Sequence, residues 1–172
     1  MTARHLHDRA SPILDAGAGT GRVGELLAIL GYSHLVALDL SDAMLAKARE
    51  RSVYGELHQC ALGDPLVFAD GTFVAVVAAG VFTAGHAPPA SFDELLRVTR
   101  PGGSLIFTLA TSAYERGGFR DKLCALEAEG RWRLIETTAP FCGMRASDAY
   151  REHTARLLVF QMVGGSLVQS TA

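Results

Sequence analysis

The chain has 172 residues, which fits one domain, and 49% of them are hydrophobic, enough to bury a core without metal or disulfide staples. Its net charge of −2 argues against a protein whose main partner is a nucleic acid, because such proteins usually need a basic face. The three cysteines form neither a disulfide framework nor a metal-binding pair, so we expect no metal site and a cytoplasmic location. The sequence leaves the oligomeric state open.

No segment has the pattern of a membrane anchor or of a signal peptide. The longest stretch without charged side chains runs from Gly71 to Phe92, but its apolar part is only about half the roughly 20 residues that a spanning helix needs. We therefore expect a buried strand there and no membrane as a partner. Residues 1–172 are assigned to a single domain in which residues 1–12 and 164–172 are loose ends.

Apolar strands and amphipathic helices alternate along most of the chain. Strands are expected over residues 13–16, 35–38, 57–62, 73–80, 104–109, 132–138 and 154–162. Helices are expected from Val23 to Leu30, from Ser41 to Arg51, from the capping box Ser91–Glu94 to the residues before Pro101, and from Tyr114 to Gly130. This alternation predicts an α/β fold, a Rossmann-like three-layer sandwich with a mostly parallel sheet. The last two strands have no helix between them, so an antiparallel C-terminal pair completes a seven-stranded sheet.

The first expected strand ends in a glycine-rich loop, Asp15 to Gly21, which leads into the first helix. In an open α/β sheet, ligands bind at the carboxyl ends of the strands, and glycines there let the backbone come close to the ligand. Asp39 ends the second strand, where a carboxylate can accept both hydroxyls of a ribose. Together the loop and Asp39 predict a ligand that contains a nucleoside.

Two kinds of nucleoside ligand have to be weighed. Residues 19–24 match Gly-x-Gly-x-x-Gly, the dinucleotide fingerprint, which indicates a nicotinamide-dependent oxidoreductase. However, the first glycine after the strand is Gly17, and counted from there the third glycine position falls on the bulky Arg22. Asp15 also puts a negative charge at the end of the strand, which suits an ammonium group better than a pyrophosphate. These points favour S-adenosylmethionine, which has an ammonium and an adenosine but no phosphate, and they leave the oxidoreductase as a less favoured alternative.

Four segments, in the right order, resemble motifs of the class I S-adenosylmethionine-dependent methyltransferases. They are residues 13–21 (first motif), residues 36–45 (second motif), residues 68–77 (leading into the fourth strand) and residues 100–103 (the turn before the fifth strand). Residues 79–86, Ala-Gly-Val-Phe-Thr-Ala-Gly-His, look more narrowly like the Williams–Beuren-region methyltransferase-like proteins. The resemblance extends from Ile13 to Met162 and implies the fold and the cofactor of that family.

The resemblance implies cofactor-binding roles for residues at the ends of the strands. The expected residues are Asp15 and Gly17 at the methionine amino end, Gly19 and Gly21 where the loop approaches closely, Asp39 at the ribose, Leu40, Met44, Ala61 and Leu62 around the adenine, and Gly80 on the methyl-transfer side. His86 follows the fourth strand, where reaction centres form in such folds, so it is the candidate general base.

Two departures from the family pattern bear on activity. Relatives usually carry an aspartate where this chain has Ala61, and that carboxylate accepts the adenine amino group. Only twelve residues precede the first expected strand, so we expect the N-terminal segment that covers the cofactor in relatives to be missing. The sequence therefore predicts methyl transfer from S-adenosylmethionine to a small-molecule acceptor. It also leaves open a catalytically weak or inactive protein that acts as a ligand-binding or partner subunit.

Overall fold

The computed structural model describes residues 8–142 and 154–163 of the chain. In these ranges the strands are β1 (Ile13–Ala16), β2 (Leu35–Asp39), β3 (Glu56–Gln59), β4 (Phe73–Phe82), β5 (Thr99–Ala110), β6 (Trp132–Thr137), β7 (Phe141–Cys142) and β8 (Thr154–Met162). The helices are α2 (Arg22–Ile29), α3 (Asp42–Glu50), α4 (Ser91–Val98), α5 (Thr111–Arg116) and α6 (Phe119–Ala128).

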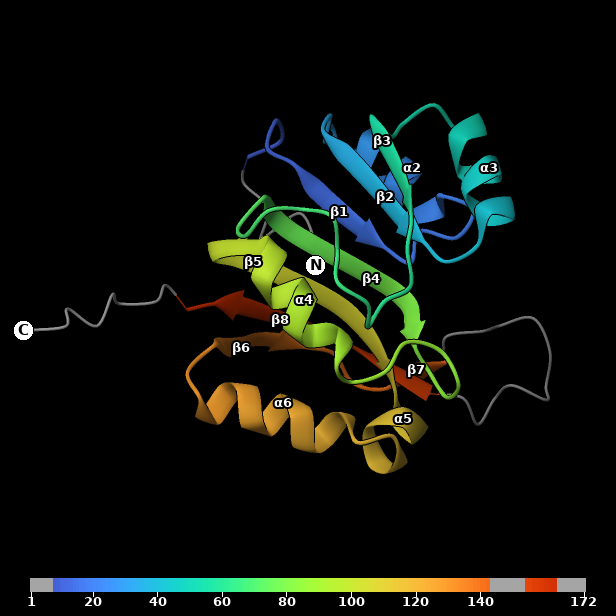
Figure 1. Cartoon of the computed structure of the whole chain (residues 1–172). Coiled ribbons are helices and arrows are strands. Elements are labelled where there is room, and N and C mark those ends of the chain that lie inside the picture. Colours follow the sequence, from blue (N-terminus) through green and yellow to red (C-terminus); the bar gives the residue numbers. More distant parts are fainter. Residues whose placement is uncertain (1–7, 143–153, 164–172) are drawn as a thin grey trace, which may run out of the picture.

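The strands form one mixed sheet in the order β3-β2-β1-β4-β5-β8-β6, and the two-residue strand β7 pairs with β8 outside this path (Figure 1). Each pair of neighbouring strands from β3 through β5 is parallel. Strand β8 runs antiparallel to β5, β6 and β7. The predicted α/β class is therefore confirmed, with a mostly parallel sheet and antiparallel pairing at its C-terminal end.

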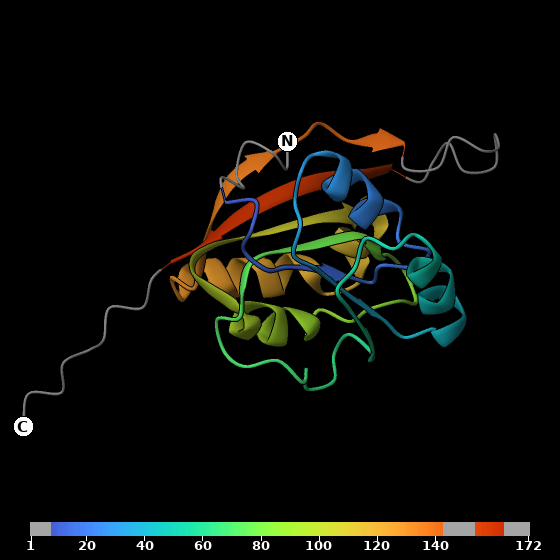
Figure 2. The same ribbon diagram turned by 90° about the horizontal axis from the view of Figure 1, so that it is seen from above.

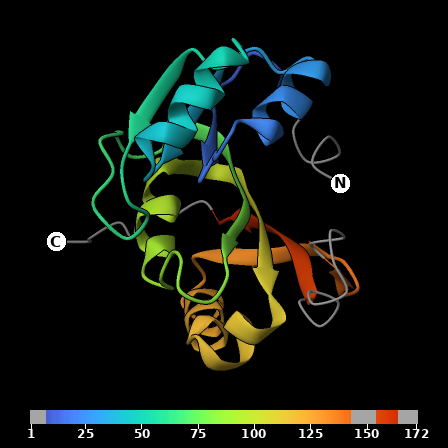
Figure 3. The same ribbon diagram turned by 90° about the vertical axis from the view of Figure 1, so that its right-hand side faces the viewer.

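Helices cover both faces of the sheet (Figure 2). Helix α2 packs on one face, where Leu27 joins a core cluster with Ile13 of β1. Helices α4 and α6 cover the opposite face, where Phe92 and Leu123 join the cluster that contains Leu14. Figure 3 shows the sheet between the layer of α2 and α3 and the layer of α4 and α6. Because the strands from β3 through β5 run in the same direction, their carboxyl ends and the loops that follow them lie at one edge of the sheet.

The helix predicted from Tyr114 to Gly130 is two helices, because Gly117 and Gly118 interrupt it. The Gly117 N–H donates to the carbonyl of Ala113 at 2.7 Å and so closes α5. Gly118 precedes α6 with a φ of 75°, a left-handed conformation that favours glycine. The helical periodicity continues across this break, so the apolar pattern alone predicts one helix.

The capping box predicted at Ser91 and Glu94 is wrong. The Ser91 hydroxyl is buried and has no hydrogen-bond partner among the described residues. Glu94 Oε2 instead accepts the N–H of Leu66 at 2.6 Å. The physical reason is the neighbouring Arg97, whose guanidinium binds the carboxylate and holds it toward the loop between β3 and β4.

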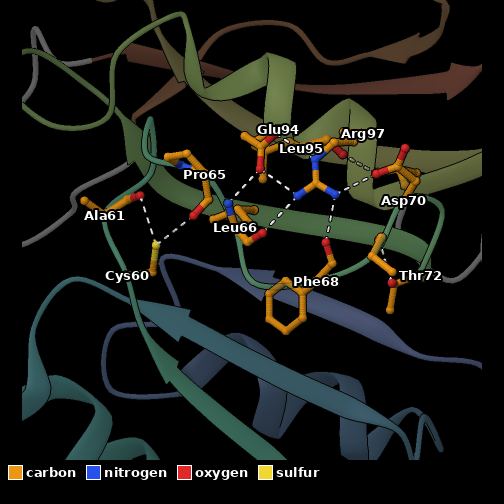
Figure 4. A network of polar contacts seen from close by, with 12 residues as sticks. Cys60, Ala61, Pro65, Leu66, Phe68, Asp70, Thr72, Glu94, Leu95 and Arg97 are labelled. Carbon is orange, nitrogen blue, oxygen red and sulfur yellow. Dashed lines mark hydrogen bonds and ion pairs between the residues drawn. The ribbon is translucent and has the colours of Figure 1, made fainter.

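Arg97 attaches the loop between β3 and β4 to α4 (Figure 4). Its guanidinium donates to the carbonyl oxygens of Leu66 at 3.0 Å and Phe68 at 2.8 Å. It also pairs with the carboxylates of Glu94 at 2.7 Å and Asp70 at 2.8 Å. We call this group the Arg97 network. It fixes the loop whose first residues, described below, form one wall of the candidate site.

Of the segments predicted to be loose ends, residues 1–7 and 164–172 lie outside the described residues. The carbonyl of Arg9 accepts a hydrogen bond from the N–H of Ser33 at 3.1 Å. The carbonyl of Pro12 accepts one from the N–H of Val74 at 3.0 Å. The described residues before β1 are thus hydrogen-bonded to the fold. Within the described part of the chain, no helix has the length and apolar character needed to cross a membrane.

Candidate functional site

A pocket of about 370 Å³ lies where β1, β2, β3 and β4 end, and we call it the strand-end pocket. The predicted site residues that line it are Gly17, Asp39, Leu40, Ala61, Leu62, Gly80 and His86. They come from the ends of four strands that follow one another in the sequence, and the parallel sheet places those ends together. One pocket therefore collects most of the residues that the sequence singled out.

The other predicted residues, Asp15, Gly19, Gly21 and Met44, do not line the strand-end pocket. Asp15 is only 1% exposed, whereas Met44 is 40% exposed on α3. Gly19 and Gly21 shape the loop with φ values of 54° and 77°. Direct contact of these residues with a cofactor stays a prediction.

Six further lining residues are absent from the sequence-based prediction: Leu38, Cys60, Ala79, Val81, Gly85 and Ala87. Most of them look like ordinary apolar residues of strands and loops, and nothing in their type points to a site. Gly85 is different, because a glycine directly before His86 is a turn signal. That signal could have predicted a tight turn at the candidate base.

The glycine loop turns sharply at Gly17, where φ is 77°. The N–H groups of Gly17 and Ala18 both donate to the carbonyl of Leu38, at 2.7 and 3.0 Å. A Cβ on Gly17 would lie 2.3 Å from Val81 Cγ2. The loop therefore crosses the end of β4 with no room for a side chain at this position.

We expect Gly17→Ala to lower the free energy of unfolding by about 2 kcal/mol, because an alanine would combine left-handed strain with a collision against Val81. Gly102→Ala is the matched control, since Gly102 has a φ of 75° but no atom within 4 Å of its Cβ position. It should lose only about 1 kcal/mol, from the strain alone. Urea denaturation measures both, and equal losses would contradict the role of the close packing.

Asp39 connects two loops at the edge of the pocket. Its Oδ2 accepts the N–H of Gly19 at 2.7 Å, and its Oδ1 accepts the N–H of Ser41 at 2.9 Å. Because a carboxylate offers about four lone-pair positions, both oxygens keep capacity to accept further hydrogen bonds. The arrangement suits a diol such as that of a ribose.

The residues after β3 form another wall of the pocket. Strand β3 ends at Gln59, so Ala61 and Leu62 lie in the loop and not in the strand that the sequence predicted. The Cys60 N–H donates to the carbonyl of Asp39 at 3.1 Å, which joins this wall to β2. Burial, followed by the nearby carboxylates of Asp64 and Glu94, raises the pKa of the Cys60 thiol. A thiol with a raised pKa stays protonated and is a poor nucleophile.

Asp15, where β1 passes into the glycine loop, belongs to a chain of hydrogen bonds. Its Oδ2 accepts the hydroxyl of Tyr54 at 2.6 Å, and Tyr54 Oη accepts the N–H of Gly24 at 3.1 Å. A Cβ on Gly24 would lie 2.2 Å from Tyr54 Oη. The last glycine of the apparent dinucleotide fingerprint is thus explained by the room that Tyr54 needs.

Burial dominates the electrostatics of Asp15. It raises the pKa of the carboxyl group from 3.8 to about 6, although the hydrogen bonds from Tyr54 and Gly24 act in the opposite direction and the charge of Asp39 adds slightly to the rise. Asp15 Oδ1 is buried and has no hydrogen-bond partner among the described residues. In this structure the Asp15 side chain is buried, binds the hydroxyl of Tyr54 and does not line the strand-end pocket.

Three observations indicate that the strand-end pocket suits S-adenosylmethionine. No atom lies within 4 Å of the Cβ position of Gly80, so the wall on the expected methyl-transfer side is open. Leu40 and Leu62 offer apolar surface beside the carboxylate of Asp39. Among the described lining residues there is no lysine or arginine, which suits a ligand without a phosphate better than a dinucleotide.

The comparisons with known proteins agree with this fit. Residues 14–107, more than half of the chain, match the family described as methyltransferase domain. Human methyltransferase-like protein 27 is 36% identical over 124 residues, which are 70% of this chain and 50% of that protein. A malonyl-[acyl-carrier protein] O-methyltransferase of Erwinia pyrifoliae is 31% identical over 163 residues, 93% of this chain and 53% of that protein. The chain thus spans about half the length of the curated relatives that it matches.

The fold has close counterparts among solved structures. An S-adenosylmethionine-dependent methyltransferase of Methanosarcina mazei superposes with a TM-score of 0.74 over 95% of this chain and 98% of that one. At 14% sequence identity this likeness shows the fold alone. Together with the family match, it confirms the predicted cofactor, S-adenosyl-L-methionine, over the dinucleotide alternative. The chain belongs to the class I family of S-adenosylmethionine-dependent methyltransferases.

Proposed function

We propose that the strand-end pocket binds S-adenosylmethionine and that the protein transfers the methyl group of this cofactor to a small-molecule acceptor. The observation that carries the proposal is the convergence of Gly17, Asp39, Leu62 and Gly80 on one pocket from four strand ends. The bound cofactor supplies an electrophilic methyl group on a sulfonium. The protein contributes mainly orientation, by holding a nucleophile in line with that methyl group.

Each lining residue has a distinct part in this proposal. Asp39 accepts the ribose hydroxyls with the lone pairs that Gly19 and Ser41 leave free. Leu40 and Leu62 flank the adenine, and the loop at Gly17 approaches the methionine end without a side chain. Asp15, Gly21 and Met44 stay predicted contacts.

The proposal is tested by calorimetry with S-adenosylhomocysteine, which has the same nucleoside. We expect Asp39→Ala to weaken binding by about 10–100-fold, because hydrogen bonds to a charged group are lost together with the support of the loop. Asp42→Ala is the matched control, since Asp42 is an exposed carboxylate three residues away and does not line the pocket. Its affinity should stay within about twofold of the wild type. No binding to the wild type at about millimolar ligand would refute the proposal.

One observation favours a second candidate, a protein of the same fold that binds the ligand with little or no catalysis. Ala61 lines the pocket at the position where the family pattern implies an aspartate, and the aspartate that follows it in the chain, Asp64, is exposed and does not line the pocket. The adenine amino group therefore lacks that acceptor. Binding of S-adenosylhomocysteine without methyl transfer to any of a broad set of acceptors would support this candidate, and any turnover would remove it.

The small-molecule acceptor, the closeness to the Williams–Beuren-region proteins, the single domain over residues 1–172 and the cytoplasmic location stay predictions. So does the expectation that neither a nucleic acid nor a membrane is a partner.

A further inference from the structure

A tight turn at the end of β4 holds the candidate base at the wall of the strand-end pocket. The N–H of His86 donates to the carbonyl of Thr83 at 3.3 Å, the bond that closes a four-residue turn. The third residue, Gly85, has a φ of 79°, and a type II turn needs a positive φ at that position. Gly85 and His86 both line the pocket, so the turn sets where the imidazole stands.

The imidazole folds back onto the same turn through its Nδ1 atom. This atom lies 2.8 Å from Thr83 Oγ1 and 3.3 Å from the carbonyl oxygen of Ala84. A carbonyl oxygen can only accept a hydrogen bond, whereas a hydroxyl can accept or donate. Both contacts are satisfied only if Nδ1 carries the proton. The Nε2 atom then keeps its lone pair, and it has no partner among the described residues.

We propose that Thr83 and the carbonyl of Ala84 hold His86 in the Nδ1–H tautomer, and that the acceptor methylated in the pocket is therefore a neutral hydroxyl. The inference about the acceptor rests on the proposed function. Thr83 is a positioning residue, because it acts on the reaction only through His86.

The chemistry of the nucleophile connects the tautomer to the substrate class. A neutral amine or a carboxylate can attack a methyl group with a lone pair that is already available, so neither needs a base. A hydroxyl has to lose its proton during the transfer. Its oxygen forms the bond to the methyl carbon, the carbon–sulfur bond breaks with its electron pair staying on sulfur, and the proton goes to Nε2 of His86. The sulfonium becomes a neutral thioether and the imidazole takes up the positive charge.

The limited basicity of an imidazole restricts which kinds of hydroxyl can be the acceptor. An imidazole takes a proton most readily from a hydroxyl that is already fairly acidic, such as a phenol or an enol. The apolar side chain of Val81, which lines the same pocket and has no part in the adenine contacts proposed above, can contact a planar ring. The geometry thus points to a phenolic or enolic hydroxyl.

The tautomer can be read from the ring nitrogens of the ¹⁵N-labelled protein by NMR, at a pH high enough to keep the imidazoles neutral. A protonated ring nitrogen and an unprotonated one resonate far apart, so each histidine reports its own tautomer. His58 is an internal control, because its Nε2 lies 2.9 Å from Glu56 Oε2 and has to carry the proton there. We expect His86, assigned by His86→Asn, to show the opposite pattern.

Two variants separate the hydroxyl of Thr83 from the shape of its side chain. Thr83→Val should shift His86 toward the Nε2–H tautomer that free histidine prefers, and Thr83→Ser should keep the wild-type pattern. An Nε2–H tautomer in the wild-type protein, or identical spectra for Thr83→Val and Thr83→Ser, would overturn the proposal. S-Adenosylhomocysteine binding is measured on the same samples, so a failure of the proposed function is seen separately from a failure of the tautomer.

The substrate class is tested by titrating phenol into the complex with S-adenosylhomocysteine. A hydroxyl that donates to His86 should move the Nε2 resonance toward that of a hydrogen-bonded nitrogen, while benzoate, which has no proton to donate, should leave it in place. A shift with phenol and none with benzoate supports a hydroxyl as the methyl acceptor. No shift with phenol, or an equal shift with both, argues against it.

Discussion

Arg97→Ala should lower the free energy of unfolding by about 3 kcal/mol, which is a large part of the stability of a domain of this size. The guanidinium makes charge-assisted hydrogen bonds to the carboxylates of Glu94 and Asp70. It also donates to two backbone carbonyls of the loop between β3 and β4. Hydrogen bonds from Arg97, followed by that from the Leu66 N–H, lower the pKa of Glu94 to about 2. Removal of Arg97 leaves Glu94, whose side chain is only 23% exposed, without its countercharge.

Lys122→Ala is the matched control for Arg97→Ala, because Lys122 also pairs with a carboxylate of α4. Its partner Asp93 is 53% exposed, and the pair involves no loop carbonyl. Screening by water should limit the loss to less than about 1 kcal/mol. Urea denaturation of the two variants measures the difference. Equal effects would mean that the Arg97 network is an ordinary surface ion pair.

Asp15→Asn should change how stability depends on pH. The folded protein holds the proton of Asp15 more tightly than the unfolded chain, since burial raises its pKa from 3.8 to about 6. The stabilisation from the protonated carboxyl is complete below about pH 4 and is lost as the pH rises through about 6. The shift corresponds to a loss of about 3 kcal/mol over that interval. The asparagine variant has no proton to lose there and should escape this decline.

The measurement is the difference in unfolding free energy between Asp15→Asn and the wild type, taken by urea denaturation from pH 4.5 to pH 7.5. Comparison at each pH cancels the contributions of other groups, such as Glu94. The difference should move in favour of the variant as the pH rises through about 6 and should level off above that pH. Asp121→Asn changes a side chain that is 81% exposed and should give a flat line. A flat line for Asp15→Asn as well would show that the carboxylate is not held in an apolar environment.

Local sequence was enough to predict where β1 and β2 end and which residues follow them, whereas β3 ends before the predicted Leu62. The apolar runs before Gly17 and Asp39 are short, and each stops at a residue whose chemistry differs sharply from that of the strand. Because the sheet is parallel, the order of such strands along the chain already implies that their ends meet at one edge. The fold class and most of the pocket follow from these two facts.

Long-range hydrogen bonds account for what the sequence pattern did not predict. Tyr54 reaches Asp15 across 39 positions, and Leu66 reaches Glu94 across 28. Neither Tyr54 nor Leu66 belongs to one of the sequence motifs described above. The spacing of Ser91 and Glu94 satisfied a local rule, but Arg97 and the loop offered Glu94 stronger partners. Patterns of spacing describe neighbours in the chain, and these contacts depend on neighbours in space.

The two backbone bonds to Asp39 also bear on how much affinity its carboxylate can provide. A side chain that is free in the empty protein loses rotamer freedom when a ligand arrives, and that loss subtracts about 0.5–1.5 kcal/mol from binding. Asp39 has already given up this freedom on folding, because Gly19 and Ser41 hold one oxygen each. A ribose would meet acceptors that are already oriented, so nearly all the energy of its hydrogen bonds becomes affinity. Because Gly19 of the glycine loop donates one of these hydrogen bonds, the order of the loop and the affinity for the ligand change together.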